Sequence, residues 1–119
     1  MANKKIICFD LDNVICKTLN KNYNKSTPIK KSVDIINFLY FKNYYIKIFT
    51  ARGMGKFKEN KIKVKKSYYK LTLSQLKKWK VNYHELILYK PSYDLFIDDK
   101  AYGFKKNWQK NFSNILKKI

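Results

Sequence analysis

The chain has 119 residues, of which 45% are hydrophobic and 17% aromatic. This composition excludes a mainly disordered protein, and the length predicts a single domain over residues 1–119. No apolar segment is long enough to span a bilayer, and the start of the chain lacks the apolar region of a signal peptide, so we expect a cytoplasmic protein with no membrane partner. Cys8 and Cys16 lack the spacing of a zinc site, and we expect reduced thiols.

The formal net charge of +19 predicts nonspecific binding to polyanions at low salt. The lysines are spread along the whole chain, together with many Asn, Ile and Tyr residues, as an AT-rich coding sequence would produce. Charge therefore leaves a nucleic-acid-associated protein as an alternative. Exceptions to this bias are informative: Arg52 is the single arginine among 27 basic residues, and four of only eight acids form two pairs, Asp10 with Asp12 and Asp98 with Asp99.

The first predicted element is a strand over residues 6–9, an apolar run that ends at Asp10 and Asp12. Aspartate is a poor strand former and is costly to bury, so this pair needs a compensating partner such as a divalent metal. Taken alone, the pair is equally consistent with a turn or a helix cap.

The following segments predict a parallel βαβ unit. A polar flap is expected over residues 16–27, a helix over 32–43 and a second strand over 44–50. A right-handed crossover places both strand ends at one sheet edge, so we expect Thr50 near the first acid pair. The glycine-rich turn that follows, residues 51–55, allows close approach of the backbone to a ligand.

The rest of the chain continues the alternation of helices and strands. The pattern predicts a loop over 56–66, a helix over 67–80, a strand over 86–88, a strand over 94–100 and a helix over 104–118. Lys90 is distinguished from the other lysines by Pro91, which fixes the turn beside it. We therefore predict an α/β protein, a three-layer Rossmann-like sandwich with a mostly parallel central sheet and no cap domain.

Polar side chains should converge at the carboxyl edge of this sheet: the two acid pairs, Thr50 and Lys90. Carboxylates gathered around one point repel one another unless a hard cation lies among them, and Mg²⁺ suits an all-oxygen ligand set. A magnesium site with a hydroxyl and an ammonium group nearby is complementary to a phosphoryl group.

This order of residues resembles the haloacid dehalogenase superfamily of phosphohydrolases. Asp10-Leu11-Asp12-Asn13-Val14-Ile15 is similar to its first motif, Thr50 to its second, Lys90 to its third and Asp98-Asp99 to its fourth. The segments around Arg52 and Lys90 are also similar to small phosphatases encoded with bacterial capsule and lipopolysaccharide genes.

The resemblance implies a role for each residue. Asp10 would be the nucleophile that forms an aspartyl-phosphate, and Asp12 the general acid and base. Mg²⁺ would be held by Asp10, by the backbone carbonyl of Asp12 and by Asp98, with Asp99 bound directly or through water. Substrate binding would fall to four residues: Thr50, Ala51, Arg52 and Lys90. We expect Arg52 to contact the substrate beyond its phosphate.

The predicted function is Mg²⁺-dependent hydrolysis of a small phosphorylated metabolite, a sugar or polyol phosphate of surface-polysaccharide biosynthesis. Without a cap the site is open, so a homo-oligomer would cover it or macromolecular substrates would enter. The alternatives are a polynucleotide phosphatase and a nucleic-acid-binding module. A response-regulator receiver is disfavoured because Lys90 precedes the Asp98-Asp99 pair, the reverse of the receiver order.

Overall fold

The protein is built on a three-stranded parallel sheet. The computed structural model describes residues 4–119; the first three residues, part of the segment expected to lack a signal peptide, lie outside the described residues. Strands β1 (Ile6–Asp10), β4 (Tyr45–Phe49) and β5 (Glu85–Ile87) lie in the order β1-β4-β5, and both strand pairs are parallel. The predicted strands at these places are confirmed within one or two residues.

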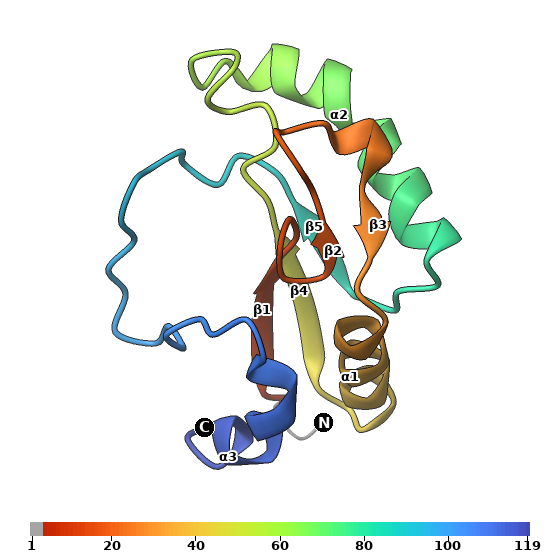
Figure 1. Cartoon of the computed structure of the whole chain (residues 1–119), viewed down its shortest axis with the longest axis vertical. Helices are drawn as coiled ribbons and strands as arrows, with labels where there is room; N and C mark the ends of the chain where they lie inside the picture. Colours follow the sequence, from red (N-terminus) through yellow and green to blue (C-terminus); the bar gives the residue numbers. More distant parts are fainter. Residues whose placement is uncertain (1–3) are drawn as a thin grey trace.

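Two helices connect these strands in sequence: α1 (Lys30–Phe41) joins β1 to β4 and α2 (Lys61–Lys78) joins β4 to β5 (Figure 1). Their buried side chains share one core with one face of the sheet. That core is formed by twelve buried residues: Phe9, Leu11, Ile15, Cys16, Val33, Ile36, Leu39, Ile46, Ile48, Leu76, Val81 and Trp108. The predicted α/β class, with a parallel sheet and no cap domain, is confirmed.

Strand alternation assigns the side chains to the two faces of the sheet. Phe9 pairs with Ile48 in register, and both are buried on the core face. On the other face Cys8 is exposed, and Lys47 forms an ion pair with Glu85 (Nζ–Oε2 3.6 Å). The parallel register also brings the carboxyl ends of β1 and β4 together, because Asp10 pairs with Phe49.

The polar segment after β1 folds over this edge as a flap. It contains β2 (Cys16–Lys17), the 3₁₀ turn η1 (Tyr23–Lys25) and β3 (Thr27–Pro28), and β2 and β3 pair antiparallel. Asn13 adopts φ 67°, which turns the chain back on itself directly after the two carboxylates. The flap expected from the sequence is therefore present and is anchored by the hairpin.

Helix α2 begins six residues earlier than predicted. Asn60 is its N-cap, and the Asn60 Oδ1 accepts a hydrogen bond from the Lys63 N–H (3.2 Å). Val64 is fully buried in the turn that follows. The sequence predicts a loop here because the lysine-rich stretch before Ser67 has no apolar periodicity. In the structure its helical part buries a single residue, Val64.

The strand predicted over residues 94–100 is wrong. Residues 88–107 contain no strand and cross from β5 to the C-terminal helices as a long exposed loop (Figure 1). Leu95 is 77% and Ile97 87% exposed, so the apolar residues of this segment have no neighbouring strand or helix to pack against. The predicted last helix is shortened to η2 (Trp108–Asn111) and α3 (Phe112–Leu116).

The last two helices close one end of the core. Trp108 is buried and packs against Phe9, with 6.1 Å between the ring centroids.

Among the residues that the structure describes, no helix has the length and apolarity that crossing a membrane would require.

Candidate active site

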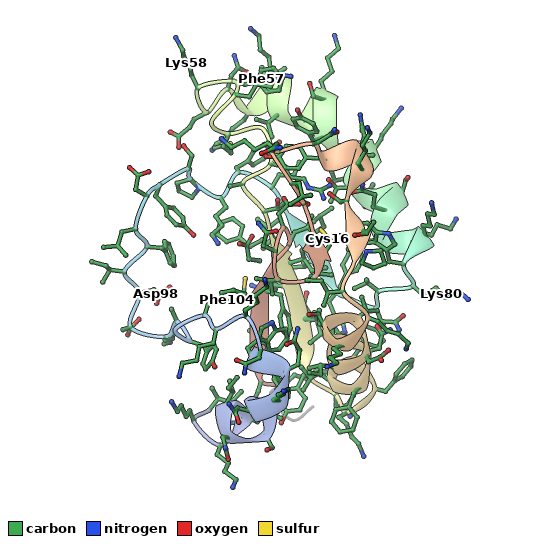
Figure 2. All side chains as sticks on the ribbon, in the orientation of Figure 1. Cys16, Phe57, Lys58, Lys80, Asp98 and Phe104 are labelled. Carbon is green, nitrogen blue, oxygen red and sulfur yellow. The ribbon has the colours of Figure 1, made fainter. Side chains whose placement is uncertain are left out.

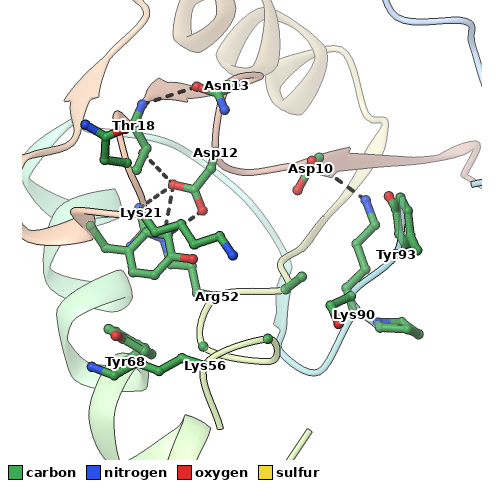
Figure 3. Close-up of a pocket in the computed structure, with 17 residues that line it drawn as sticks. Asp10, Asp12, Asn13, Thr18, Lys21, Arg52, Lys56, Tyr68, Lys90 and Tyr93 are labelled. Carbon is green, nitrogen blue, oxygen red and sulfur yellow. Dashed lines mark hydrogen bonds and ion pairs between the residues drawn. The ribbon is translucent and has the colours of Figure 1, made fainter. Parts of the chain in front are cut away.

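A cavity of about 760 Å³ opens at the carboxyl ends of β1 and β4, under the flap (Figure 3). Two carboxylates and four basic groups are part of its lining, so its charge suits an anion with phosphoryl oxygens. These charged residues are Asp10, Asp12, Lys21, Arg52, Lys56 and Lys90.

Asp10 is oriented from both sides of its carboxylate. The Leu11 N–H donates to Oδ1 (2.8 Å), and the Lys90 Nζ lies 3.7 Å from Oδ2. Burial raises the pKa of Asp10, and the ammonium of Lys90 opposes this rise without cancelling it. The Asp10 side chain is still 40% exposed, and Asp10 is part of the cavity lining.

The position of Lys90 is set by a backbone hydrogen bond and by its aromatic neighbours. Its N–H donates to the Thr50 carbonyl (3.1 Å), and the preceding Tyr89 has φ 74°. Its Nζ lies 5.5 Å from the ring centroids of both Tyr93 and Phe96. Burial lowers the pKa of Lys90, but contact with Tyr93 and the charge of Asp10 outweigh it, and the net pKa is raised; Lys90 is therefore a cation at neutral pH.

Asp12 forms an ion pair with Arg52 at the back of the cavity. The Arg52 Nε lies 3.2 Å from Oδ1 and 3.1 Å from Oδ2 of Asp12, and Nη2 lies 3.0 Å from Oδ1. The Thr18 hydroxyl of the flap donates to the same Oδ1 (2.6 Å). Arg52, in the turn that follows β4, and Thr18, in the flap, therefore fix the orientation of the Asp12 carboxylate.

The remaining donors of Arg52 bind protein groups. Nη1 donates to Gln75 Oε1 (2.6 Å) and to the Thr72 hydroxyl (3.2 Å), both on α2, and the guanidinium lies 4.9 Å from the Tyr23 ring centroid. The Arg52 side chain has no exposed area. Although Arg52 lines the cavity, this geometry favours a role in positioning Asp12 over the substrate contact predicted from the sequence.

Thr50 is buried and connects strand ends. Its N–H donates to the Ile87 carbonyl (3.0 Å), and its Oγ1 accepts from the Arg52 N–H (3.2 Å). Thr50 does not line the cavity, whereas Ala51 does. The structure thus gives Thr50 contacts that position Arg52 and Lys90, and its expected phosphoryl contact remains a prediction.

The structure does not bring Asp98 and Asp99 to Asp10 and Asp12. Both lie exposed in the loop over 88–107, outside the cavity lining, and Figure 2 shows Asp98 on the part of this loop that extends away from the sheet. Within residues 4–119 no group of three or more His, Cys, Asp or Glu side chains could hold a metal ion. The structure therefore does not bring the four predicted magnesium ligands together, and the magnesium site stays a prediction.

Sequence reasoning missed the residues that complete the cavity. Lys21 and Tyr23 come from the flap, Lys56 from the turn after Gly55, and Tyr68 from α2. Tyr23 and Tyr68 meet edge to face, with 5.1 Å between ring centroids, and join the flap to α2. Among the sequence signals, only the glycine-rich turn indicated close packing here. In the structure Gly53 has φ 80°, and the Tyr68 ring lies close to its Cα.

No family model matches this chain, and no curated protein shows significant similarity to it. The fold does match solved structures. An MCSG target from Vibrio cholerae has a TM-score of 0.81 and 21% sequence identity, over 96% of this chain and 98% of that one. Two structures of the Pnkp1/Rnl/Hen1 complex, one of them called an RNA repair complex, have TM-scores of 0.54 and 0.53 at 17% identity, over 82% and 98% of this chain but 31% and 32% of theirs.

These identities establish similarity of fold. The Rossmann-like α/β architecture is shared over nearly the whole chain with the Vibrio cholerae structure, and this chain spans about a third of the length of the matching chains in the Pnkp1/Rnl/Hen1 complex. Membership of the haloacid dehalogenase superfamily stays a prediction from the motifs.

Proposed function

We propose that the chain is a phosphomonoester hydrolase of the capless haloacid dehalogenase type. The observation that carries this proposal is the Asp10–Lys90 pair in the cavity lining: the Asp10 side chain is 40% exposed, and its Oδ2 lies 3.7 Å from the Lys90 ammonium group. A nucleophile for phosphorus and a cation for phosphoryl oxygens are thereby adjacent.

The chemistry assigned to these residues is a double displacement. An Asp10 carboxylate oxygen attacks phosphorus as the bond from phosphorus to the ester oxygen breaks, and the carboxyl form of Asp12 gives its proton to that leaving oxygen. The resulting Asp12 carboxylate then takes a proton from the water that cleaves the aspartyl-phosphate, which restores its carboxyl form and the Asp10 carboxylate. Lys90 offsets the charge of the phosphoryl group throughout. Arg52 and Thr18 hold Asp12 in the orientation that this transfer requires.

The substrate that the sequence resemblance suggests is a small sugar or polyol phosphate of surface-polysaccharide biosynthesis. The phosphorylated end of a nucleic acid is a second candidate. It is favoured by the four basic groups that line the open cavity and by likeness to part of the Pnkp1/Rnl/Hen1 RNA repair complex.

A screen of an aryl phosphate, phosphorylated metabolites and phosphorylated oligonucleotides, each with and without Mg²⁺, tests the proposal. We expect phosphate release by the wild type and none by Asp10→Asn. Retained turnover in Asp10→Asn would refute the mechanism, and the comparison with and without Mg²⁺ decides whether hydrolysis needs the metal.

A further inference from the structure

A second concave surface lies beside the first on helix α2. This lysine–tyrosine groove has a volume of about 510 Å³ and is lined by Lys61, Ile62, Lys65, Lys66, Tyr69, Lys70 and Tyr89. The four lysines are exposed and the two tyrosines half-buried, and its lining in the described chain contains no carboxylate. The catalytic chemistry above uses none of these residues.

The groove combines cations with aromatic rings at short range. The Lys61 Nζ lies 5.5 Å from the ring centroid of Tyr89, and the Lys65 Nζ lies 5.6 Å from that of Tyr69. Lysines spaced along one helix face neutralise a row of phosphates, and half-exposed rings offer surfaces on which unpaired bases stack. A small metabolite with one phosphate would leave most of these groups unused.

The groove adjoins the cavity through neighbouring residues. Tyr68 lines the cavity and Tyr69 the groove; Lys90 lines the cavity and Tyr89 the groove. Tyr89 has a positive φ, 74°, at the point where the chain passes from the groove lining to the cavity lining. Consecutive helix residues face different sides of a helix, so a single strand that bends around α2 from Tyr69 to Tyr68 would have its body in the groove and its end in the cavity.

We infer that the lysine–tyrosine groove binds the phosphodiester backbone and unpaired bases of a single-stranded nucleic acid, and that it presents the terminal phosphate of this strand to the cavity. The second half of this inference rests on the proposed function; the first half does not.

Two matched variants test the binding. The groove variant replaces Lys61, Lys65, Lys66 and Lys70 by Gln. The control variant replaces four exposed lysines outside both concavities, Lys105, Lys106, Lys117 and Lys118, by Gln and so removes the same charge. Gln has nearly the helix propensity of Lys, so both variants should fold, which circular dichroism checks.

Binding is measured by fluorescence anisotropy with a short single-stranded oligonucleotide in the Asp10→Asn background, which separates it from hydrolysis. We expect the groove variant to lose affinity by about tenfold or more and its log–log salt slope to fall by up to about 3, at 0.7 per phosphate contact, while the control variant changes little. Tyr69→Ala should weaken binding by about fivefold or more without changing the slope. The same oligonucleotide annealed to its complement serves as a duplex probe. Equal losses of affinity in the groove and control variants, or binding of the duplex as tight as that of the single strand, would overturn the inference.

Turnover then tests presentation of the terminal phosphate. In the active background, the ratio of kcat/KM for a phosphorylated oligonucleotide to that for an aryl phosphate should fall by about tenfold in the groove variant only. An unchanged ratio would refute presentation even if binding is lost. Absence of hydrolysis of every substrate by the wild type would refute the proposed function, while the anisotropy result would still decide on the groove.

Discussion

Arg52 and Asp12 form an ion pair in which the guanidinium is fully buried and the carboxylate is 20% exposed, with Nη2 and Oδ1 3.0 Å apart. The pair joins three segments that are distant in the sequence, because Arg52 also donates to Gln75 on α2 and Asp12 accepts from Thr18 in the flap. A planar guanidinium with several fixed donors suits this junction, which explains the single arginine in a chain otherwise basic through lysine.

Arg52→Ala should destabilise the fold by about 3 kcal/mol, because it leaves Asp12 and the buried Gln75 without their partner. Arg52→Lys should recover only part of this, since an ammonium cannot reproduce the paired contacts. Urea unfolding measures both. The matched control is Lys47→Ala, which removes the surface pair with Glu85 and should cost less than about 1 kcal/mol.

The kinetic effect of Arg52→Lys distinguishes positioning from substrate contact. A residue that orients Asp12 should lower kcat with little change in KM, whereas the substrate contact predicted from the sequence would mainly raise KM. Steady-state kinetics on whichever phosphate the wild type hydrolyses gives the answer, and a change confined to KM would restore the sequence-based interpretation.

The raised pKa of Asp10 predicts that its ionised carboxylate lowers the stability of the folded protein. Because the folded protein binds the Asp10 proton more tightly than the unfolded chain, this group's contribution falls as pH rises through the window between the two pKa values. Asp10→Asn should therefore raise the melting temperature at pH 7, and the gain should vanish at a pH below the ordinary carboxyl pKa.

The matched comparison is Asp34→Asn, which removes an exposed carboxylate paired with Lys30. It should leave the melting temperature almost unchanged. Melting curves of both variants at acidic and neutral pH test the prediction; a neutral-pH loss of stability in Asp10→Asn would show that the Lys90 pair outweighs the burial of Asp10.

The sequence was sufficient to predict that Asp10 and Lys90 meet. Apolar runs marked β1 and β4, and the handedness of a βαβ crossover brings parallel strand ends to one edge. Lys90 comes two residues after the strand predicted over residues 86–88, in a turn that Pro91 fixes, so it is expected at the same edge. These steps depend on local pattern and general topology alone.

The loop over residues 94–100 and the burial of Arg52 could not be predicted, because both depend on contacts that the local sequence pattern does not contain. Residues 94–100 have strand-like composition, but a strand also needs a paired neighbour, and Leu95 and Ile97 have none in the folded chain. The substrate contact predicted for Arg52 stays a prediction, but nothing in the local pattern indicates that its side chain is buried. Its burial depends on Thr72 and Gln75, 20 and 23 residues away, which no sequence spacing related to it.

The two cysteines should differ sharply in reactivity. Burial, with a smaller contribution from the Asp12 charge, raises the pKa of Cys16 to about 11, and its side chain is inaccessible in the core. Cys8 is exposed on the open face of the sheet, and burial of its thiol raises its pKa to a smaller extent. Iodoacetamide at pH 8 should modify Cys8 alone in the native protein and both thiols in denaturant, as mass spectrometry can show. Rapid native modification of Cys16 would mean that the flap opens readily.

Gly53→Ala should be destabilising, because Gly53 lies where the turn after β4 meets α2. Its φ of 80° disfavours any side chain, and an added Cβ would lie 2.7 Å from two ring atoms of Tyr68. We expect a loss of at least about 1 kcal/mol in urea unfolding. Displacement of Tyr68 would also disturb its contact with Tyr23, so kcat should fall as the flap loses its support on α2.

Gly103→Ala is the matched control for this substitution. No atom lies within 4 Å of a Cβ added at Gly103, in the exposed loop, so the free energy of unfolding should change by less than about 0.5 kcal/mol. The difference between the two glycine variants isolates the turn that carries Arg52. If both variants lose the same stability, the loss does not come from the contact with Tyr68, and the turn does not hold the flap and α2 together.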